Sequence, residues 1–284
     1  MTILKTIIMK SLKVFFIFFI LLILSFAFIN SDDPDYFLKT TGNRPFGVAF
    51  DNKGSMYMIS APNKGNGTLS KVSPDGKITD IAVLEGSFIG PGIYIDNNDG
   101  IFITVGDKLL KVSPDGNTKI IADGFSRCID VKIDKNGNIY VADDLKSTIY
   151  KITTSGKKDI FYKSDTISSF FLTSIVFDRN NENLYAREGN RIIKFRINSK
   201  STVEKPEVIT DNTKTFYLCT DNNNNIYAST IDNVIKIDTN GKVQYLSQKS
   251  LRTSIGIAIG GKGFDDKSLY VTIEDGIIKL PILK

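Results

Sequence analysis

The stretch that decides the fold runs from Val131 to Ala142 and reads VKIDKNGNIYVA. Apolar and polar residues alternate on both sides of a turn that is rich in Asp, Asn and Gly. Alternation with a period of two is typical of β-strands, and Gly- and Asn-containing turns are typical of hairpins. The segment therefore predicts a β-hairpin, in which Asp134 ends the first strand and Tyr140 lies in the second.

The same hairpin pattern occurs six times along the chain. An apolar strand, an Asp and a polar turn precede a strand with a central aromatic residue, and the equivalent positions are Asp51, Asp96, Asp134, Asp178, Asp221 and Gly260. Most units continue with two further short strands. A repeat of about 40–45 residues with four short strands is typical of propeller blades. The repeats predict an all-β fold, a six-bladed β-propeller, and leave a ring of five or seven blades as the alternative.

The two ends of the repeat region complement each other. The sixth unit stops after its third strand, at residues 276–280, and an unassigned extended segment lies before the first unit, at residues 36–40. A strand donated from this segment to the last blade would close the ring and cover an exposed sheet edge. We therefore expect an N-terminal strand to close the last blade.

The first 31 residues have the pattern of a targeting segment. Lys5, Lys10 and Lys13 precede an apolar run from Val14 to Ile29. Such a pattern is typical of a secretory signal peptide, and the run is shorter than the roughly 20 residues that span a bilayer. We expect residues 1–31 to be a signal peptide, with an uncleaved signal anchor as the alternative, and residues 32–284 to form the propeller. The protein is then secreted or extracytoplasmic, and it contacts a membrane only if the leader stays uncleaved.

The composition excludes several classes of function. The chain of 284 residues has no His, which excludes Ser-His-Asp and Cys-His catalysis and His-ligated zinc. Its two cysteines, Cys128 and Cys219, lie in different units and are expected to be free thiols. Three of the 36 basic residues belong to the leader, so 33 remain against 31 acidic ones. Nucleic-acid binding needs clustered Lys and Arg, and the sequence predicts no such partner.

The residues that recur in every unit are interpreted as structural. The shared aromatic position is expected to pack between blades, because a site is usually made by unlike residues from different blades. The Asp-rich turns resemble the start of a calcium loop, but they lack its later Gly and Glu. We interpret them as turns in which an Asp side chain binds the backbone.

Candidate functional residues lie at the mouth of the predicted channel, on the face where the chain enters each innermost strand. Four of them are charged, namely Arg127, Asp130, Asp143 and Arg187. Three more lie next to the start of an innermost strand, namely Phe46, Thr173 and Phe216. An aromatic-lined concavity with a few polar groups is typical of a binding site.

Two segments resemble known propellers. Residues 47–54 and residues 133–143 resemble strand pairs of NHL-repeat propellers and of the senescence marker protein, gluconolactonase and strictosidine-synthase-like superfamily. Residues 263–272 and 276–280 resemble the last blade of the gluconolactonase group. The resemblance covers about residues 44–280 and implies a six-bladed propeller.

The resemblance also implies where a metal would bind. Lactonase members hold a divalent metal, typically calcium, with a Glu, an Asn and an Asp, and these positions fall on Phe46, Thr173 and Phe216 here. A hard cation needs oxygen ligands, so we expect no cofactor at this site, with calcium as the alternative.

We therefore expect a non-catalytic propeller that binds a small apolar molecule or a partner protein. The apolar part of its mouth is formed by Phe46, Pro91, Ile129, Phe216 and Ile255. The alternative function is a gluconolactonase-like, calcium-dependent lactone or ester hydrolase with a divergent metal site. Such an enzyme would use Asp130, Asp143 or Glu188, and the sequence leaves the question of catalysis open.

Overall fold

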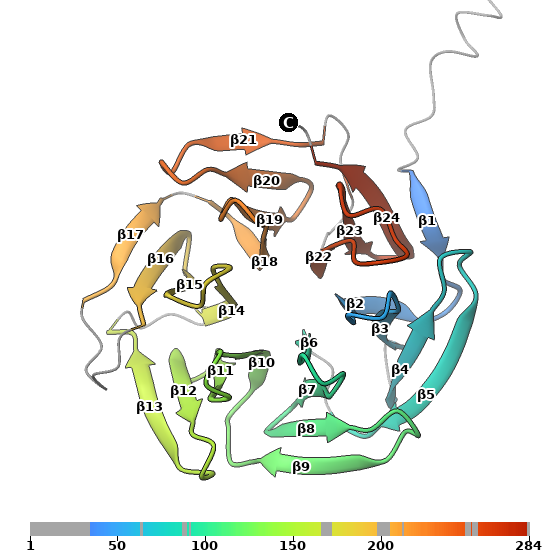
Figure 1. Ribbon diagram of the computed structural model, residues 1–284, viewed down its shortest axis with the longest axis horizontal. Coiled ribbons are helices and arrows are strands. Elements are labelled where there is room, and N and C mark those ends of the chain that lie inside the picture. The colour runs from blue at the N-terminus through green and yellow to red at the C-terminus, as the bar shows by residue number, and fades with distance from the viewer. Residues whose placement is uncertain are drawn as a thin grey trace, which may run out of the picture. The chain divides into compact units, whose positions relative to one another are not determined.

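The computed structural model describes residues 35–62, 65–86, 90, 92–165, 172–197, 205–211, 213–247, 251 and 255–282. In these ranges the chain forms six four-stranded antiparallel sheets that stand in a ring (Figure 1). This part of the chain contains no helix long and apolar enough to cross a membrane. The prediction of six blades is confirmed, and the alternatives of five or seven are excluded.

Each blade starts with its innermost strand and continues outward in chain order. Blade 1 contains β2 (Arg44–Phe50), β3 (Met56–Ala61), β4 (Gly67–Val72) and β5 (Ile78–Leu84). Blade 2 contains β6 (Ile93–Ile95), β7 (Ile101–Val105), β8 (Lys108–Val112) and β9 (Thr118–Ala122). Blade 3 contains β10 (Cys128–Ile133), β11 (Ile139–Asp143), β12 (Thr148–Ile152) and β13 (Lys158–Lys163).

The remaining blades follow the same order. Blade 4 contains β14 (Leu172–Phe177), β15 (Asn183–Glu188), β16 (Arg191–Arg196) and β17 (Glu207–Thr210). Blade 5 contains β18 (Thr215–Thr220), β19 (Ile226–Thr230), β20 (Val234–Ile237) and β21 (Val243–Tyr245). Blade 6 contains β22 (Ile257–Ile259), β23 (Ser268–Ile273) and β24 (Gly276–Pro281).

The N-terminal strand completes blade 6. Strand β1 (Tyr36–Lys39) pairs antiparallel with β24, so that the first strand of the chain is the outermost strand of the last blade. The phenol of Tyr36 also donates a hydrogen bond of 2.7 Å to Asp275 Oδ1. The prediction of N-terminal closure is confirmed. The predicted leader, residues 1–31, lies outside the described residues, so its cleavage and the location of the protein stay predictions.

The repeated Asp organises the turn between the first two strands of a blade. In blade 3, Asp134 Oδ1 accepts hydrogen bonds of 2.9 Å from the backbone N–H groups of Asn136 and Asn138. The turns that start at Asp51, Asp96, Asp178 and Asp221 use the same kind of bond. These carboxylates therefore accept hydrogen bonds from backbone N–H groups of their own turns, which confirms the interpretation of the Asp-rich turns as structural.

The core lies between the blades. Six apolar clusters are present among the described residues, and each is shared by one pair of neighbouring blades. The recurrent aromatic residues belong to these clusters and are at most 9% exposed: Tyr57, Phe102, Tyr140, Tyr185, Tyr227 and Tyr270. This confirms that the aromatic position is structural. Cys128 and Cys219 are free thiols, as predicted.

Close approach of the blades at the axis requires glycine. A Cβ on Gly92 would lie 2.5 Å from Asp130 Cα, and a Cβ on Gly256 would lie 2.3 Å from the carbonyl oxygen of Phe46. Both partners are backbone atoms of the next blade, which cannot move aside cheaply. These two glycines let blade 2 approach blade 3 and blade 6 approach blade 1.

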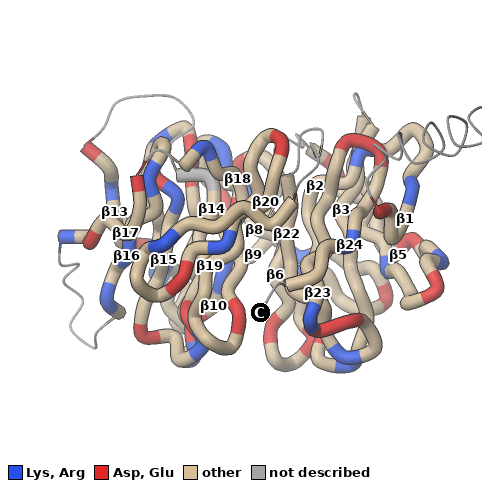
Figure 2. The backbone as a smooth tube through the Cα atoms, turned by 90° about the horizontal axis from the view of Figure 1, so that it is seen from above, with Lys and Arg blue, Asp and Glu red and all other residues tan. Residues whose placement is uncertain are grey.

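In side view, charged residues of both signs lie along the loops of both faces (Figure 2).

Candidate functional site

Two rings of residues surround the axis, with one member of each ring from every blade. The first ring lies four residues before the repeated Asp position and consists of Gly47, Gly92, Asp130, Ser174, Tyr217 and Gly256. The second ring lies two residues further along and consists of Ala49, Tyr94, Lys132, Val176, Cys219 and Ala258. Residues two apart in a strand face the same side. Unlike the aromatic position, these positions differ in chemistry from blade to blade.

Tyr217 spans the channel at the level of the first ring. Its hydroxyl lies within hydrogen-bond distance of the carbonyl oxygens of Gly90, before blade 2, and of Ile129, on blade 3, the latter at 3.1 Å. Blade 2 stands opposite blade 5 in the ring (Figure 1), so the phenol reaches across the axis. Burial raises the pKa of Tyr217 well above its usual value, and the carboxylates of Asp130 and Asp144 raise it further. The phenol therefore stays protonated and acts as a donor.

Asp130, at the same ring position in blade 3, links blades 3, 4 and 5 through hydrogen bonds. Its Oδ2 accepts hydrogen bonds from Ser174 Oγ at 2.8 Å and from the backbone N–H of Ile175 at 2.9 Å, both on blade 4. Ser174 Oγ in turn accepts a bond of 3.0 Å from the backbone N–H of Leu218 on blade 5. Asp130 Oδ1 pairs with Lys132 Nζ at 2.6 Å, and both side chains are largely buried.

A cavity of about 270 Å³ extends from this level toward the carboxyl ends of the innermost strands. All six members of the second ring line it, together with apolar residues such as Val48, Ile93, Leu218 and Ile257. The pair Lys132 and Asp130 supplies its charges. Among the seven residues that the sequence suggested for the site, Asp130 is the one that lines this cavity.

Three of the other suggested residues meet at the opposite end of the channel, between blades 3 and 4. Arg127 Nε donates a hydrogen bond of 2.7 Å to Asp144 Oδ1, and this bond raises the pKa of Arg127. Burial lowers the pKa of Arg187 to about 10, while Asp144 acts in the opposite direction. Asp143 is fully buried and accepts bonds from the backbone N–H groups of Ser126 and Arg127, at 2.7 and 3.1 Å. Asp143 therefore holds the loop that carries Arg127.

The positions that the resemblance assigns to metal ligands do not suit a metal. Phe46 lies in β2 and Phe216 in β18, both half-buried, and neither ring offers an oxygen. The backbone of Thr173 lies in β14, and its side chain is outside the described part. Among the described residues no three Cys, Asp or Glu side chains gather in a way that could hold a metal ion. The residues present at these positions do not fit a calcium ion, because calcium needs six or more oxygen ligands.

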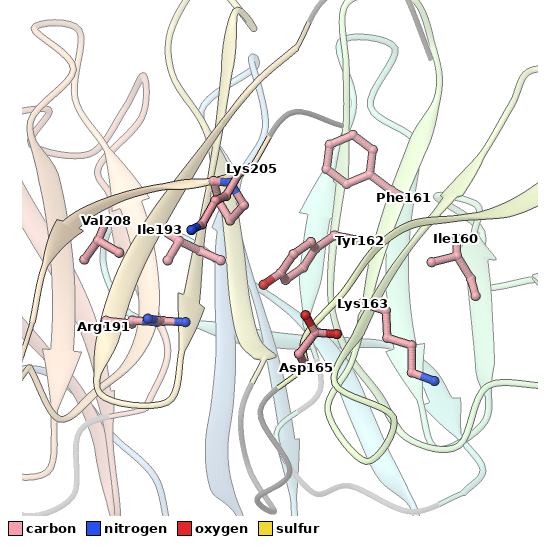
Figure 3. A pocket seen from close by; sticks show the side chains of 10 residues that line it. Ile160, Phe161, Tyr162, Lys163, Asp165, Arg191, Ile193, Lys205 and Val208 are labelled. Atoms are coloured by element: carbon pink, nitrogen blue, oxygen red, sulfur yellow. The ribbon is translucent and has the colours of Figure 1, made fainter. Parts of the chain in front are cut away.

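A second hollow of about 470 Å³ lies on the outer rim between blades 3 and 4. Side chains of β13, including Tyr162, face side chains of β16 and β17, including Arg191 and Val208 (Figure 3). Glu188 accepts bonds here from Tyr162 Oη at 2.7 Å and from Arg191 Nε at 2.8 Å. This carboxylate is thus part of the packing of two blades.

The sequence reasoning missed Lys132, Cys219 and the role of Tyr217. A signal was present, because the first-ring position is Gly in three units and Tyr in the fifth. A large aromatic residue in a position that is otherwise glycine must fill the space that the glycines leave. The second ring is found in the same way, by aligning the units and asking where they differ.

Comparison with known proteins agrees with the fold. No protein-family model and no curated protein matches the sequence. The structure is similar to a gluconolactonase from Xanthomonas campestris, at 13% identity and a TM-score of 0.71, with 87% of each chain covered. A virginiamycin B lyase from Staphylococcus aureus with quinupristin matches at 17% identity and a TM-score of 0.60, over 85% of this chain and 96% of that chain.

A third similar structure comes from a nidogen–laminin complex. It matches at 19% identity and a TM-score of 0.61, over 72% of this chain and 79% of that chain. Enzymes and a component of a protein complex thus share this architecture. The chain is a six-bladed β-propeller whose fold is similar to the gluconolactonase and virginiamycin B lyase structures.

Proposed function

We propose that this protein is a binding propeller, whose channel takes up a small and mostly apolar molecule on the side of Tyr217 that faces the carboxyl ends of the innermost strands. The observation that carries the proposal is the second ring. Its members line one cavity, and they combine apolar walls at Ala49, Val176 and Ala258 with a single ammonium group at Lys132. Apolar walls with few polar groups are the usual character of a small-molecule site.

The size of the cavity limits the ligand. Binding cavities for drug-sized molecules hold about 300–1,000 Å³, and this one holds about 270 Å³. A single ring compound with a short substituent suits it. Burial of such a ligand against the channel walls stabilises the complex by about 25 cal/mol for each Å² of apolar surface removed from water.

Hydrolysis of a lactone or ester is the second candidate, and the gluconolactonase among the similar structures favours it. The side chains that the structure describes at the expected metal positions argue against the metal mechanism, since Phe46 and Phe216 carry no ligand atom. An assay of lactone hydrolysis with and without added calcium separates the two candidates. The binding proposal predicts no rate above that of the buffer.

The binding proposal is tested by methyl-labelled NMR of residues 32–284 during a titration with cyclohexanone. We expect the methyl signals of Val48, Val176 and Leu218 to shift together in a saturable way. The signals of Ile160 and Val208, in the rim hollow, serve as an internal control and stay unchanged. The absence of shifts in the channel, or shifts confined to the rim, would contradict the proposal.

A pair of variants gives the matched control. Ala258→Phe places a ring in the cavity and is expected to abolish the channel shifts. Val83→Phe adds the same ring at a residue that is 65% exposed on the outer strand of blade 1, and it is expected to leave the titration unchanged. Equal binding by both variants would contradict the assignment of the site.

A further inference from the structure

The polar groups of the channel cavity are unequal in the hydrogen bonds that they still offer. An ionised carboxylate has two oxygens and about four acceptor positions. Asp130 Oδ1 accepts from the backbone N–H of Val131 at 2.8 Å and from Lys132 Nζ at 2.6 Å. Its Oδ2 accepts from Ser174 Oγ and from the backbone N–H of Ile175. The carboxylate of Asp130 is therefore saturated by the protein.

Lys132 is not saturated in the same way. An ammonium group carries three protons, and the structure uses two of them, toward Asp130 Oδ1 and toward the carbonyl oxygen of Val131 at 3.1 Å. The third proton has no partner among the described residues and remains for a group in the cavity, which Lys132 lines. The charged pair thus offers a ligand one donor and no acceptor.

The other polar side chains of the cavity are neutral, namely the hydroxyls of Tyr94, Tyr217 and Thr220 and the thiol of Cys219. The hydroxyl of Tyr94 lies 3.5 Å from the carbonyl oxygen of Ile133, and all three hydroxyl oxygens keep lone pairs that can accept a hydrogen bond. The hydroxyl of Thr220 donates to the carbonyl oxygen of Phe177 at 2.8 Å, and the hydroxyl of Tyr217 donates to carbonyl oxygens across the channel. A thiol such as that of Cys219 is a weak donor, and burial raises its pKa, so it stays neutral. The inner edges of the strands offer backbone N–H and C=O groups alike and therefore do not discriminate.

The charge of the ligand then decides which ligands the cavity accepts. The pair of Asp130 and Lys132 is neutral as a whole, and it lies in a largely buried place. A carboxylate ligand would meet the field of Asp130 as well as that of Lys132 and would lose its hydration. An ammonium ligand would find no free acceptor on Asp130 and would be repelled by Lys132. A neutral acceptor, such as the oxygen of a ketone or an amide, meets neither cost.

We propose that the channel selects uncharged molecules that carry a carbonyl oxygen, and that Lys132 is the residue that recognises this oxygen. This inference rests on the proposed binding function and adds the chemical class of the ligand. It assigns to Lys132 a hydrogen bond to the ligand and to Asp130 the role of holding the ammonium group in place.

The test compares four probes of one size by the same NMR titration: cyclohexanone, methylenecyclohexane, cyclohexanecarboxylate and cyclohexylammonium. Cyclohexanone and methylenecyclohexane have nearly the same shape and differ in the acceptor. We expect cyclohexanone to bind about 3- to 10-fold more tightly than methylenecyclohexane, which is the worth of one hydrogen bond. The two charged probes are expected to bind more weakly than cyclohexanone, and cyclohexylammonium most weakly.

Substitution of the lysine gives the second arm. In Lys132→Met the preference for cyclohexanone over methylenecyclohexane is expected to vanish, whereas Lys111→Met, at a lysine on β8 outside the cavity lining, keeps it. If Lys132→Met does not fold, equal affinity of the two neutral probes for the unaltered protein still overturns the role of Lys132.

The outcomes separate the two proposals. Binding of cyclohexanone and methylenecyclohexane with equal affinity overturns the role of Lys132 and leaves the binding function intact. Tightest binding of cyclohexanecarboxylate overturns the selection of uncharged ligands. Failure of all four probes to shift the channel methyl signals overturns the binding function itself.

Discussion

The phenol of Tyr217 on blade 5 hydrogen-bonds to the carbonyl oxygen of Gly90, which lies before blade 2 on the opposite side of the ring. The bond joins residues that are 127 positions apart in the chain. It fixes the aromatic ring across the axis, because blade 5 holds one end of the side chain and blades 2 and 3 hold the other. The cavity of the second ring begins at this level.

Replacement of Tyr217 by Phe tests whether this bond stabilises the ring. The change leaves the carbonyl oxygens of Gly90 and Ile129 without this donor, and we expect a loss of about 0.5–1.5 kcal/mol in the free energy of unfolding by urea. Tyr94→Phe is the control, because its hydroxyl lies 3.5 Å from the carbonyl oxygen of Ile133, at the limit of a hydrogen bond. Equal losses of unfolding free energy in the two variants would show that the cross-channel bond of Tyr217 stabilises the fold no more than the long contact of Tyr94.

The missing Asp of blade 6 gives a second prediction. A Cβ on Gly260 would lie 2.1 Å from the carbonyl oxygen of Asp265, so the repeat residue Asp has no room there. Gly260→Asp restores the repeat pattern and is nevertheless expected to destabilise the protein by about 1–3 kcal/mol. Gly260→Ala should show most of this loss, because the overlap begins at Cβ. Thermal unfolding of both variants checks this, and an unchanged or higher melting temperature contradicts it.

The pH dependence of stability has a component from Glu188. Burial alone would raise its pKa, but hydrogen bonds from Ser164, Tyr162 and Arg191 outweigh burial and hold the pKa below its ordinary value of 4.5. A group with a lowered folded pKa stabilises the fold above the unfolded value and loses that contribution as the pH falls through the folded value. The contribution of Glu188 is therefore complete at pH 7 and fades below about pH 4.5.

Glu188→Gln is the variant that measures this component. We expect it to be less stable than the unaltered protein at pH 7 by about 1–3 kcal/mol, because charged hydrogen bonds are lost. The difference should shrink as the pH is lowered to about 3 in urea unfolding experiments. Glu182→Gln changes an exposed glutamate and serves as the control. A difference that grows toward low pH would contradict the direction of the shift.

Calcium is expected to leave the protein unchanged. A ligand that binds the folded state at 100 times its dissociation constant stabilises it by about 2.7 kcal/mol, which is visible in thermal unfolding. Because the rings of Phe46 and Phe216 replace oxygen ligands, we expect the same melting temperature in calcium chloride and in sodium chloride of equal ionic strength. A saturable rise of the melting temperature with calcium alone would indicate a metal site and would favour the lactone or ester hydrolase as the function.

The fold could be predicted because its information is local and repeated. Each hairpin carries its own Asp, its own turn and its own aromatic residue, so six weak signals at one spacing agree. The binding cavity could not be predicted in this way, because it depends on residues that differ between the units. Asp130, Ser174 and Tyr217 occupy one repeat position, and their bonds cross between blades that are 40 or more residues apart.

The mouth residues show a second limit of sequence reasoning. The sequence predicts one face for Arg127, which lies before an innermost strand, and for Asp143 and Arg187, which lie where the second strand turns into the third. The structure places all three near Asp144 or its loop. Asp143 also accepts hydrogen bonds from the backbone of the loop that carries Arg127, and Arg127 donates to Asp144, which no local pattern reveals. Burial of charged groups is set by the docking of two blades.

The most direct test of the binding site is a crystal structure of the protein with 4-bromocyclohexanone, in which anomalous scattering locates the bromine. We predict one molecule in the channel, among Val48, Val176 and Leu218, with its carbonyl oxygen within hydrogen-bond distance of Lys132 Nζ. An empty channel in crystals that bind the compound elsewhere, or a molecule whose oxygen points away from Lys132, would contradict it.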